Sequence, residues 1–136
     1  MARIDQTLRI ILADPPPGVV FSKQDAKNRP VDPIRSEGDL FFDIPITLTP
    51  TPDGFRPGGA FVRNDSRGRF VYIASGRAAG DCRTDWQRRL KVYLNTLPTQ
   101  FADGQVLQAI IAGRAKDGGP ACATVPLLSG WTSVTP

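Results

Sequence analysis

Hydrophobic and polar residues alternate most regularly in DLFFDIPITLTP, at residues 39–50. An alternation with a period of two is typical of a β-strand with one buried face. The apolar face of this stretch carries Leu40, Phe42, Ile44, Ile46 and Leu48, and we expect this row to lie in the core. Pro45 falls on the opposite face. Because proline has no N–H for the strand ladder, it predicts an edge strand or a bulge at this point.

Several other stretches also predict strands, and turn residues separate them. They are TLRIILAD at 7–14, GVVFSKQ at 18–24, AFVRNDSRGRFVYIASG at 60–76 with a turn at NDSRG, and SGWTSVTP at 129–136, which reads as a last short strand or a tail anchored by Trp131. Residues 22–38 are polar and contain two prolines, and they predict a long loop.

TDWQRRLKVYLNTLP, at residues 84–98, fits two structures. Thr84 and Gln87 have the spacing of a helix capping box, and the leucines that follow have helical spacing. The same stretch also alternates from residue 88 onward, with one apolar and one polar face. We favour the strand, because KVYL suits a pleated surface, and we leave room for at most one short helix.

Near the C-terminus, QVLQAIIAGRAK (105–116) and PACATVPLL (120–128) flank the dipeptide Asp117-Gly118. Asp-Gly favours the two-residue turn of a β-hairpin, because both central positions need a positive φ. This pairing places Gly113 roughly opposite Cys122. The glycines then have a structural purpose that requires no ligand.

Strand patterns with frequent turns predict an all-β fold. Thirteen glycines and thirteen prolines in 136 residues also favour an all-β fold, because these residues break helices and mark turns between strands. The length suits one domain over residues 1–136. We expect a two-layer antiparallel β-sandwich, and a small closed β-barrel is the alternative.

The chain contains no histidine. This removes the most common general base and the most common metal ligand, and it excludes Ser-His-Asp and Cys-His machinery within one chain. No phosphate loop, dinucleotide fingerprint, calcium loop or CxxC motif is present. We therefore expect no cofactor and no metal. No stretch resembles a signal peptide or a membrane span, so we expect a cytoplasmic protein without a membrane partner.

The net charge of +4 is unevenly distributed. Residues 56–91 hold nine basic and three acidic side chains, a net charge of +6, and the rest of the chain carries −2. Nearly all of the basic residues in this segment are arginines, which bind carboxylate or phosphate groups in a bidentate manner. The predicted ligand-binding residues are Arg63, Arg69, Trp86, Arg88, Arg89, Lys91 and Tyr93. Trp86 and Tyr93 are interleaved with the basic residues and would offer rings for stacking, or they form an ordinary half-buried strand face.

Two cysteines are the remaining candidates for chemistry. Cys82 lies in a polar stretch beside Arg83, and because a nearby arginine favours the thiolate, it is the candidate reactive thiol. Cys122 lies in an apolar stretch and reads as a buried small residue. Without histidine, any enzyme here would use a cysteine thiol or aspartates in a cleft.

Four motifs occur in an order that resembles a known family. They are PPPGVVF, GRFVYIASG, WQRRLKVYL and DGGPACATV, and together they span most of the chain. The chain resembles a small bacterial family, domain-of-unknown-function family 5990. The resemblance implies one compact bacterial domain, and it carries no activity and no catalytic residue.

These observations favour a non-catalytic binding or interaction module over an enzyme. Its arginine-rich surface would bind an anionic small molecule or an acidic protein. The basic excess is smaller than nucleic-acid-binding proteins usually have, so nucleic acid ranks last among the partners. A small enzyme that uses a thiol or aspartates remains the alternative function.

Overall fold

Eleven strands and no helix make up the regular structure of the residues that the computed structural model describes, which are 3–52, 54–76, 88–94, 104–114, 124–125 and 131–134. The strands are β1 (Ile4–Ala13), β2 (Val20–Gln24), β3 (Pro30–Arg35), β4 (Leu40–Thr51), β5 (Gly54–Gly58), β6 (Arg63–Asp65), β7 (Gly68–Gly76), β8 (Arg88–Tyr93), β9 (Gln105–Ala112), β10 (Thr124–Val125) and β11 (Thr132–Val134).

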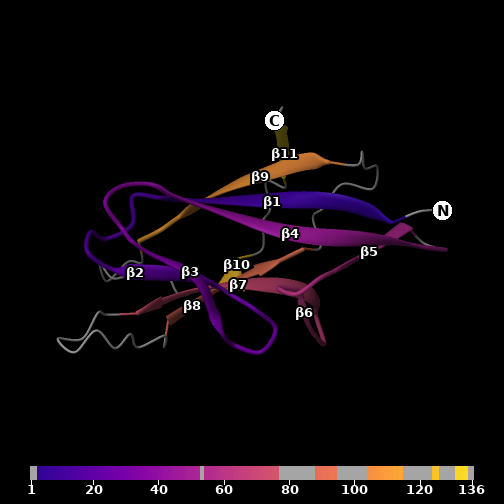
Figure 1. Ribbon diagram of the computed structural model, residues 1–136, viewed down its shortest axis with the longest axis horizontal. Coiled ribbons are helices and arrows are strands. Elements are labelled where there is room, and N and C mark those ends of the chain that lie inside the picture. Colours follow the sequence, from indigo (N-terminus) through magenta and orange to yellow (C-terminus); the bar gives the residue numbers. More distant parts are fainter. Residues whose placement is uncertain are drawn as a thin grey trace.

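The strands form two sheets, which lie one above the other as two layers (Figure 1). Sheet A has the order β11-β9-β1-β4-β5, and sheet B has the order β10-β8-β7-β2-β3, with β6 paired to β7. The predicted all-β, two-layer sandwich is confirmed, and within the described residues no sheet closes into a barrel. The pairing is mixed rather than purely antiparallel, because β9 runs parallel to β1 and β10 runs parallel to β8.

The core lies between the sheets, and the alternation in the sequence accounts for it. On β4 the predicted row is buried throughout, from Leu40 to Leu48. Leu8, Ile10 and Leu12 of β1 face the same layer and are inaccessible to solvent. Sheet B contributes alternating apolar side chains of its own. They are Val71 and Ile73 of β7, Leu90 and Val92 of β8, and Leu94 directly after β8. The predicted core row of residues 40–48 is confirmed.

The two interpretations of residues 84–98 are resolved where the structure describes them. Residues 88–93 form β8, which pairs antiparallel with β7 from Ser75↔Arg88 to Phe70↔Tyr93. The strand prediction is therefore confirmed for this part. The apolar alternation prevails over the helical spacing, because β8 buries Leu90 and Val92 against sheet A.

The prediction of a long loop over residues 22–38 is wrong. β2 and β3 form an antiparallel hairpin there, with an irregularity in the register between Phe21 and Lys23. β3 forms an outer edge of sheet B, and its two prolines are tolerated at that position because an edge strand leaves one side of its backbone unpaired. Polar composition concealed the strand because five of the six residues in β3 are exposed.

Pro45 lies at a local sheet edge, as its missing N–H predicts. β4 pairs with β1 from Leu40 to Leu48, but β5 covers its other side only from Thr47 onward. On that open side the ammonium of Lys23 donates a 2.9 Å hydrogen bond to the carbonyl oxygen of Asp43. Pro45 and this lysine together occupy positions at which another strand would otherwise add to the sheet.

The predicted hairpin around Asp117-Gly118 is wrong in its pairing. Its turn and Cys122 lie outside the described residues, but Thr124–Val125 form β10 and pair with β8 in sheet B. β9 instead pairs with β1 on one side and with β11 on the other. Gly113 therefore packs on a different neighbour: a Cβ at this position would lie 3.1 Å from the carbonyl oxygen of Ala13 and 3.1 Å from Pro15.

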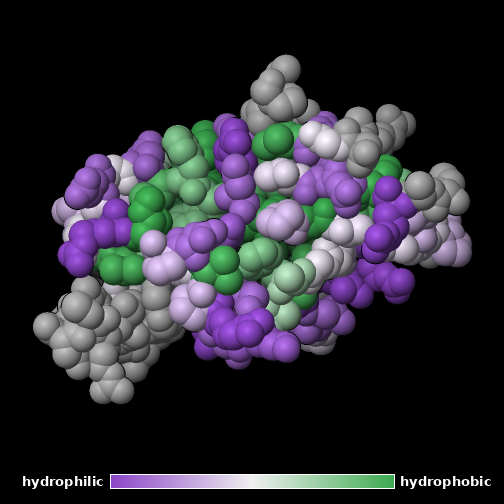
Figure 2. Space-filling view, in the orientation of Figure 1, coloured by the Kyte–Doolittle hydropathy of each residue, from purple (hydrophilic) through white to green (hydrophobic). Residues whose placement is uncertain are grey.

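The predicted C-terminal strand is confirmed as β11, and Trp131 packs against the core beside it. On the side of the molecule seen in Figure 2, hydrophobic residues reach the surface as separate patches among hydrophilic ones. Within the part of the chain that the structure describes, no helix has the length and apolar character needed to cross a membrane.

Candidate functional site

The basic residues predicted from the sequence converge mainly on the outer face of sheet B, the face turned away from sheet A. Cross-strand partners have side chains on the same side of a sheet, and β7 pairs Phe70 with Tyr93, Tyr72 with Lys91 and Ala74 with Arg89. On its other side β7 pairs with β6, which places Arg63 opposite Phe70. We call this surface the cationic–aromatic face, and it consists of Arg63, Asp65, Phe70, Tyr72, Arg89, Lys91 and Tyr93.

Tyr72 lies at the centre of this face and contacts two guanidinium groups. The central carbon of Arg63 and that of Arg89 each lie 5.2 Å from the centroid of its ring. The two arginines come from opposite sides of β7, since β6 and β8 flank it. Within the described residues, neither guanidinium has a carboxylate partner. The ring therefore holds two positive charges that no described acid neutralises.

The β2–β3 hairpin holds one of these arginines in place. The Nη1 of Arg63 donates a hydrogen bond to the side-chain oxygen of Asn28. Asn28 has a φ of 63°, in the left-handed region that asparagine tolerates better than most residues. Its N–H donates a 3.0 Å bond to the carbonyl oxygen of Asp25. The orientation of Arg63 therefore depends on the conformation of this loop.

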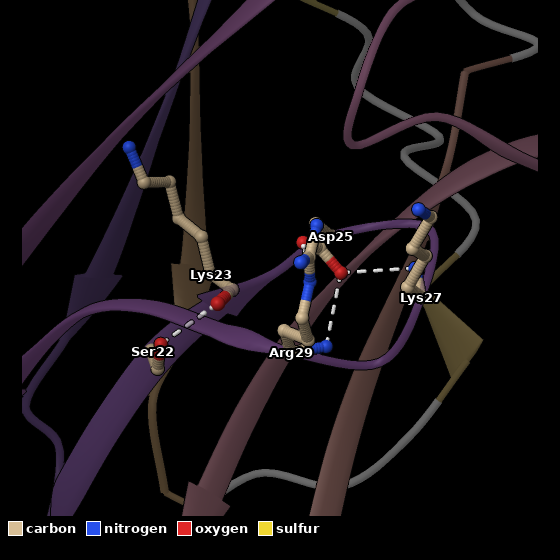
Figure 3. Close-up of polar contacts among 5 residues, drawn as sticks. All are labelled: Ser22, Lys23, Asp25, Lys27 and Arg29. Carbon is tan, nitrogen blue, oxygen red and sulfur yellow. Dashed lines mark hydrogen bonds and ion pairs between the residues drawn. The ribbon is translucent and has the colours of Figure 1, made fainter.

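Asp25 organises that loop (Figure 3). Its Oδ1 accepts 2.9 Å bonds from the backbone N–H groups of Lys27 and Arg29, and its Oδ2 accepts a 2.8 Å bond from the Nε of Arg29. These bonds, led by the one from the backbone of Arg29, lower the pKa of Asp25 below its ordinary value, although partial burial opposes them. The side chain of Lys23 points away from this group. The loop is thus held from within by one carboxylate.

Lys91 belongs to the same face, but its charge is neutralised. Its Nζ donates to the Oδ2 of Asp65, which also accepts a 2.7 Å bond from the hydroxyl of Tyr93. The bonds from Lys91 and then Tyr93 hold the pKa of Asp65 well below its ordinary value. The bond to Asp65 raises the pKa of Lys91. The ammonium also lies 4.0 Å from the ring centroid of Phe70. This cluster locks β6 to β8 across β7.

Gln24 of β2 lies directly opposite Tyr72 in the register. Gln24 is only 2% exposed, and its Oε1 has no hydrogen-bond partner among the described residues. A buried acceptor without a partner is uncommon in proteins, and water or a ligand often satisfies it. Nothing in the sequence pattern singled out Gln24, because it ends an ordinary short strand.

The structure unites some predicted site residues and separates another. Arg63, Arg89, Lys91 and Tyr93 all lie on the cationic–aromatic face. Arg69 does not, because it pairs with Asn64 and so points to the opposite side of β7 from Phe70 and Tyr72. The expectation that Arg69 and Arg89 share one patch is wrong. Two positions project from opposite faces of one strand when their residue numbers differ by an odd number, as those of Arg69 and Tyr72 do. The pairing of β6 with β7 fixes which face is which.

The structure describes the other predicted site residues only in part. Arg88 takes part in β8 through its backbone, paired with Ser75. Trp86 and the candidate thiol Cys82 lie outside the described residues. Tyr93 is only 8% exposed and its hydroxyl is bound to Asp65, so its ring does not offer a free stacking surface. The sequence analysis did not select Tyr72. Its position two residues after Phe70 in GRFVYIASG places both rings on one face of a strand, and this spacing could have identified it.

A surface hollow of about 420 Å³ lies elsewhere, on sheet A. Its lining residues are Asp5, Gln6, Thr7, Pro45, Ile46, Thr47, Gly59, Ala60 and Gly104. None of the predicted site residues lines it. Within the described ranges, no three acidic or cysteine side chains gather in a way that would hold a metal ion.

A comparison with models of protein families identifies the family of this chain. A family model described as Family of unknown function (DUF5990) matches residues 6–134. The chain belongs to this family. The resemblance carried by the four sequence motifs is thereby confirmed. No curated protein and no solved structure matches the chain.

The matched span of DUF5990 contains the complete cationic–aromatic face and the β2–β3 hairpin that supports it. The family description assigns no activity.

Proposed function

We propose that this DUF5990 protein is a binding module that holds an anionic small molecule or the acidic surface of a protein on its cationic–aromatic face. The observation that carries the proposal is the pair of guanidinium groups, Arg63 and Arg89, that contact one ring, Tyr72, without a carboxylate partner among the described residues. Like charges held near each other repel, and an anion bound between or beside them relieves that repulsion.

The surroundings of the two arginines support the proposed binding of an anion. Arg63 is oriented by Asn28, so less side-chain freedom is lost when it binds a ligand. Lys91, in contrast, is already neutralised by Asp65, and we assign it a supporting role. The free charge of the face therefore belongs to the two arginines.

The same geometry favours carboxylate or phosphate groups over stacked nucleobases. Sequence-tolerant binding of single strands uses exposed aromatic rings. Here Phe70 and Tyr93 are buried, and Tyr72 is covered by guanidinium groups. An anionic group would approach the guanidinium edges, where their N–H donors are directed.

The test is a thermal-shift series at matched ionic strength, with phosphate, citrate and chloride as probes. At ten times the dissociation constant, a bound anion should raise the melting temperature by roughly 3–6 °C more than chloride does. The variant Arg63→Gln/Arg89→Gln should lose this difference. The matched control is Arg69→Gln, which removes an arginine from the opposite side of β7 and should keep it. Equal responses of the double variant and the wild type would refute the proposal.

A further inference from the structure

A row of large apolar side chains crosses the outer face of sheet A, far from the site proposed above. Ile11 of β1 pairs with Phe41 of β4 on one side and with Ile110 of β9 on the other. Phe41 is 65% exposed and Ile110 is 66% exposed. The three side chains thus lie in register on three adjacent strands. Single exposed apolar residues are ordinary, but an aligned row is a contiguous patch.

The neighbouring row carries one positive and one negative charge in the same register. Arg9 pairs with Asp43 across β1 and β4, and its Nε and Nη2 donate bonds of 2.8 and 3.1 Å to the two carboxylate oxygens. Their side chains remain 37% and 50% exposed. The two rows together present an apolar pair, Ile11 and Phe41, beside a charged pair, on the same two strands.

This arrangement is self-complementary. Consider a two-fold axis that runs parallel to the strands, in front of the sheet and midway between β1 and β4. It places Arg9 of one copy opposite Asp43 of the other, and Asp43 opposite Arg9. The same operation places Ile11 opposite Phe41 and Phe41 opposite Ile11. A two-fold interface requires one surface to complement itself, and these two rows meet that requirement.

We infer that the outer face of sheet A is a homodimer interface whose occupant is a second copy of this chain. A partner of one charge sign would meet both an attractive and a repulsive group in the charged row, whereas a second copy meets two attractive pairs. The side chains of Ile11 and Phe41 would be removed from water on both copies, which supplies the driving force. The charged row would fix the register and exclude other orientations.

The inference is independent of the proposed function. The interface uses sheet A, and the cationic–aromatic face lies on the outer side of sheet B, so both copies would keep that face open. A dimer would then present two anion-binding faces, and a partner with two acidic segments would bind it with higher avidity than one face allows.

The test is sedimentation equilibrium of the full chain over a wide range of concentrations, with the wild type and two variants. The wild type should dimerise. Phe41→Glu should self-associate at least about tenfold more weakly, because two carboxylates would enter the apolar row. Ile34→Glu is the matched control, because Ile34 is also an exposed apolar residue but lies on β3 of sheet B. It should dimerise like the wild type.

A charge-exchange experiment identifies the predicted pairing. Arg9→Asp alone leaves two acids in the charged row, and Asp43→Arg alone leaves two bases, so each variant should be monomeric by itself. Mixed in equal amounts, they should form a heterodimer, because each acid then faces a base across the axis. A monomeric wild type at every concentration, or a mixture that stays monomeric while the wild type dimerises, would overturn the inference.

Discussion

The outer faces of the two sheets are built by the same alternation of residues but differ in how their charges are balanced. On sheet A, the guanidinium of Arg9 is matched by the carboxylate of Asp43 in the same cross-strand row. On sheet B, Arg63 and Arg89 contact the ring of Tyr72, and neither forms an ion pair with a described carboxylate. The charges in this row of sheet A balance each other, whereas the two arginines of sheet B carry positive charge that no described carboxylate balances.

This difference supports the anion-binding function proposed for sheet B. A paired charge contributes little further attraction to an outside anion, because the carboxylate repels what the guanidinium attracts. A cation held over a ring keeps its charge, because the ring contributes only a quadrupole. Sheet A is therefore suited to an apolar, self-complementary contact, and sheet B is suited to an anion.

The largest expected effect concerns the core that supports both faces. Replacing Ile44, which is inaccessible to solvent, by Ile44→Ala should reduce the free energy of unfolding by about 2–5 kcal/mol, because a cavity forms where the side chain was. Urea unfolding followed by circular dichroism measures this. The control Phe41→Ala removes a larger side chain from the exposed side of the same strand, and at low protein concentration it should change stability by less than about 0.5 kcal/mol. Similar losses for the two variants would mean that the faces of β4 are misassigned.

A second prediction tests the parallel pairing of β9 with β1, on which the alignment of Ile110 with Ile11 depends. Gly113→Ala should cost about 1–3 kcal/mol, because its Cβ would lie 3.1 Å from backbone atoms of Ala13 and Pro15. Gly58→Ala is the matched control, since its Cβ would meet only one backbone atom, at 3.9 Å. Chemical denaturation of both variants measures the difference, and equal stabilities would contradict the placement of β9 beside β1.

The pH dependence of stability compares the carboxylates of the two faces. The pKa values of Asp65 and Asp43 are both lowered in the folded chain, Asp65 first by Lys91 and Asp43 first by Arg9. A carboxyl whose folded pKa lies below its unfolded value of about 3.9 stabilises the fold above that pH. This stabilisation is lost as the pH falls through the folded value. We therefore expect the free energy of unfolding to be constant near neutrality and to decrease below about pH 4.

Two variants assign this acid decrease to its sources. Asp65→Asn should flatten it more than Asp43→Asn, because the pKa of Asp65 is the one lowered further. Urea titrations at a series of pH values provide the measurement. If Asp43→Asn flattened the curve more, the Asp65–Lys91–Tyr93 cluster would not be the stronger of the two.

The smallest expected effect concerns the central ring of sheet B. Tyr72→Leu should reduce the free energy of unfolding by about 1–2 kcal/mol, because two exposed cation–π contacts of about 0.5–1 kcal/mol each are lost. Tyr72→Phe keeps the ring and should stay close to the wild type in thermal stability. If the leucine variant matched the phenylalanine variant in both stability and response to phosphate, the ring would have no part in holding the arginines.

Much of the strand structure could be predicted from local patterns. The alternation in DLFFDIPITLTP gave the buried face of β4, and Pro45 marked the side of β4 that β5 leaves open. β3 was missed because alternation in the sequence reveals a strand only where one of its faces is buried. Nearly all of β3 is exposed. The helix-or-strand ambiguity at residues 84–98 could not be decided locally, since both periods fitted the same leucines.

The candidate site could be predicted only in part. The concentration of arginines between residues 56 and 91 was visible in the sequence. Which arginines share a face was not, and Arg69 was assigned to the wrong group. Asn28 could not have been connected with Arg63, because 35 residues separate them and the contact exists only once the β2–β3 hairpin lies beside β6.

The sequence by itself determined the all-β class, the two faces of β4 and the position of the basic segment, because the period of two and the charge of a segment are local properties of the chain. Tertiary structure decided the rest. The pairing of β9 with β1, of β10 with β8, and of β6 and β8 with the two sides of β7 are contacts between distant segments. Strand order and register depend on which surfaces bury each other most completely, and a one-residue shift would have moved every arginine to the opposite face.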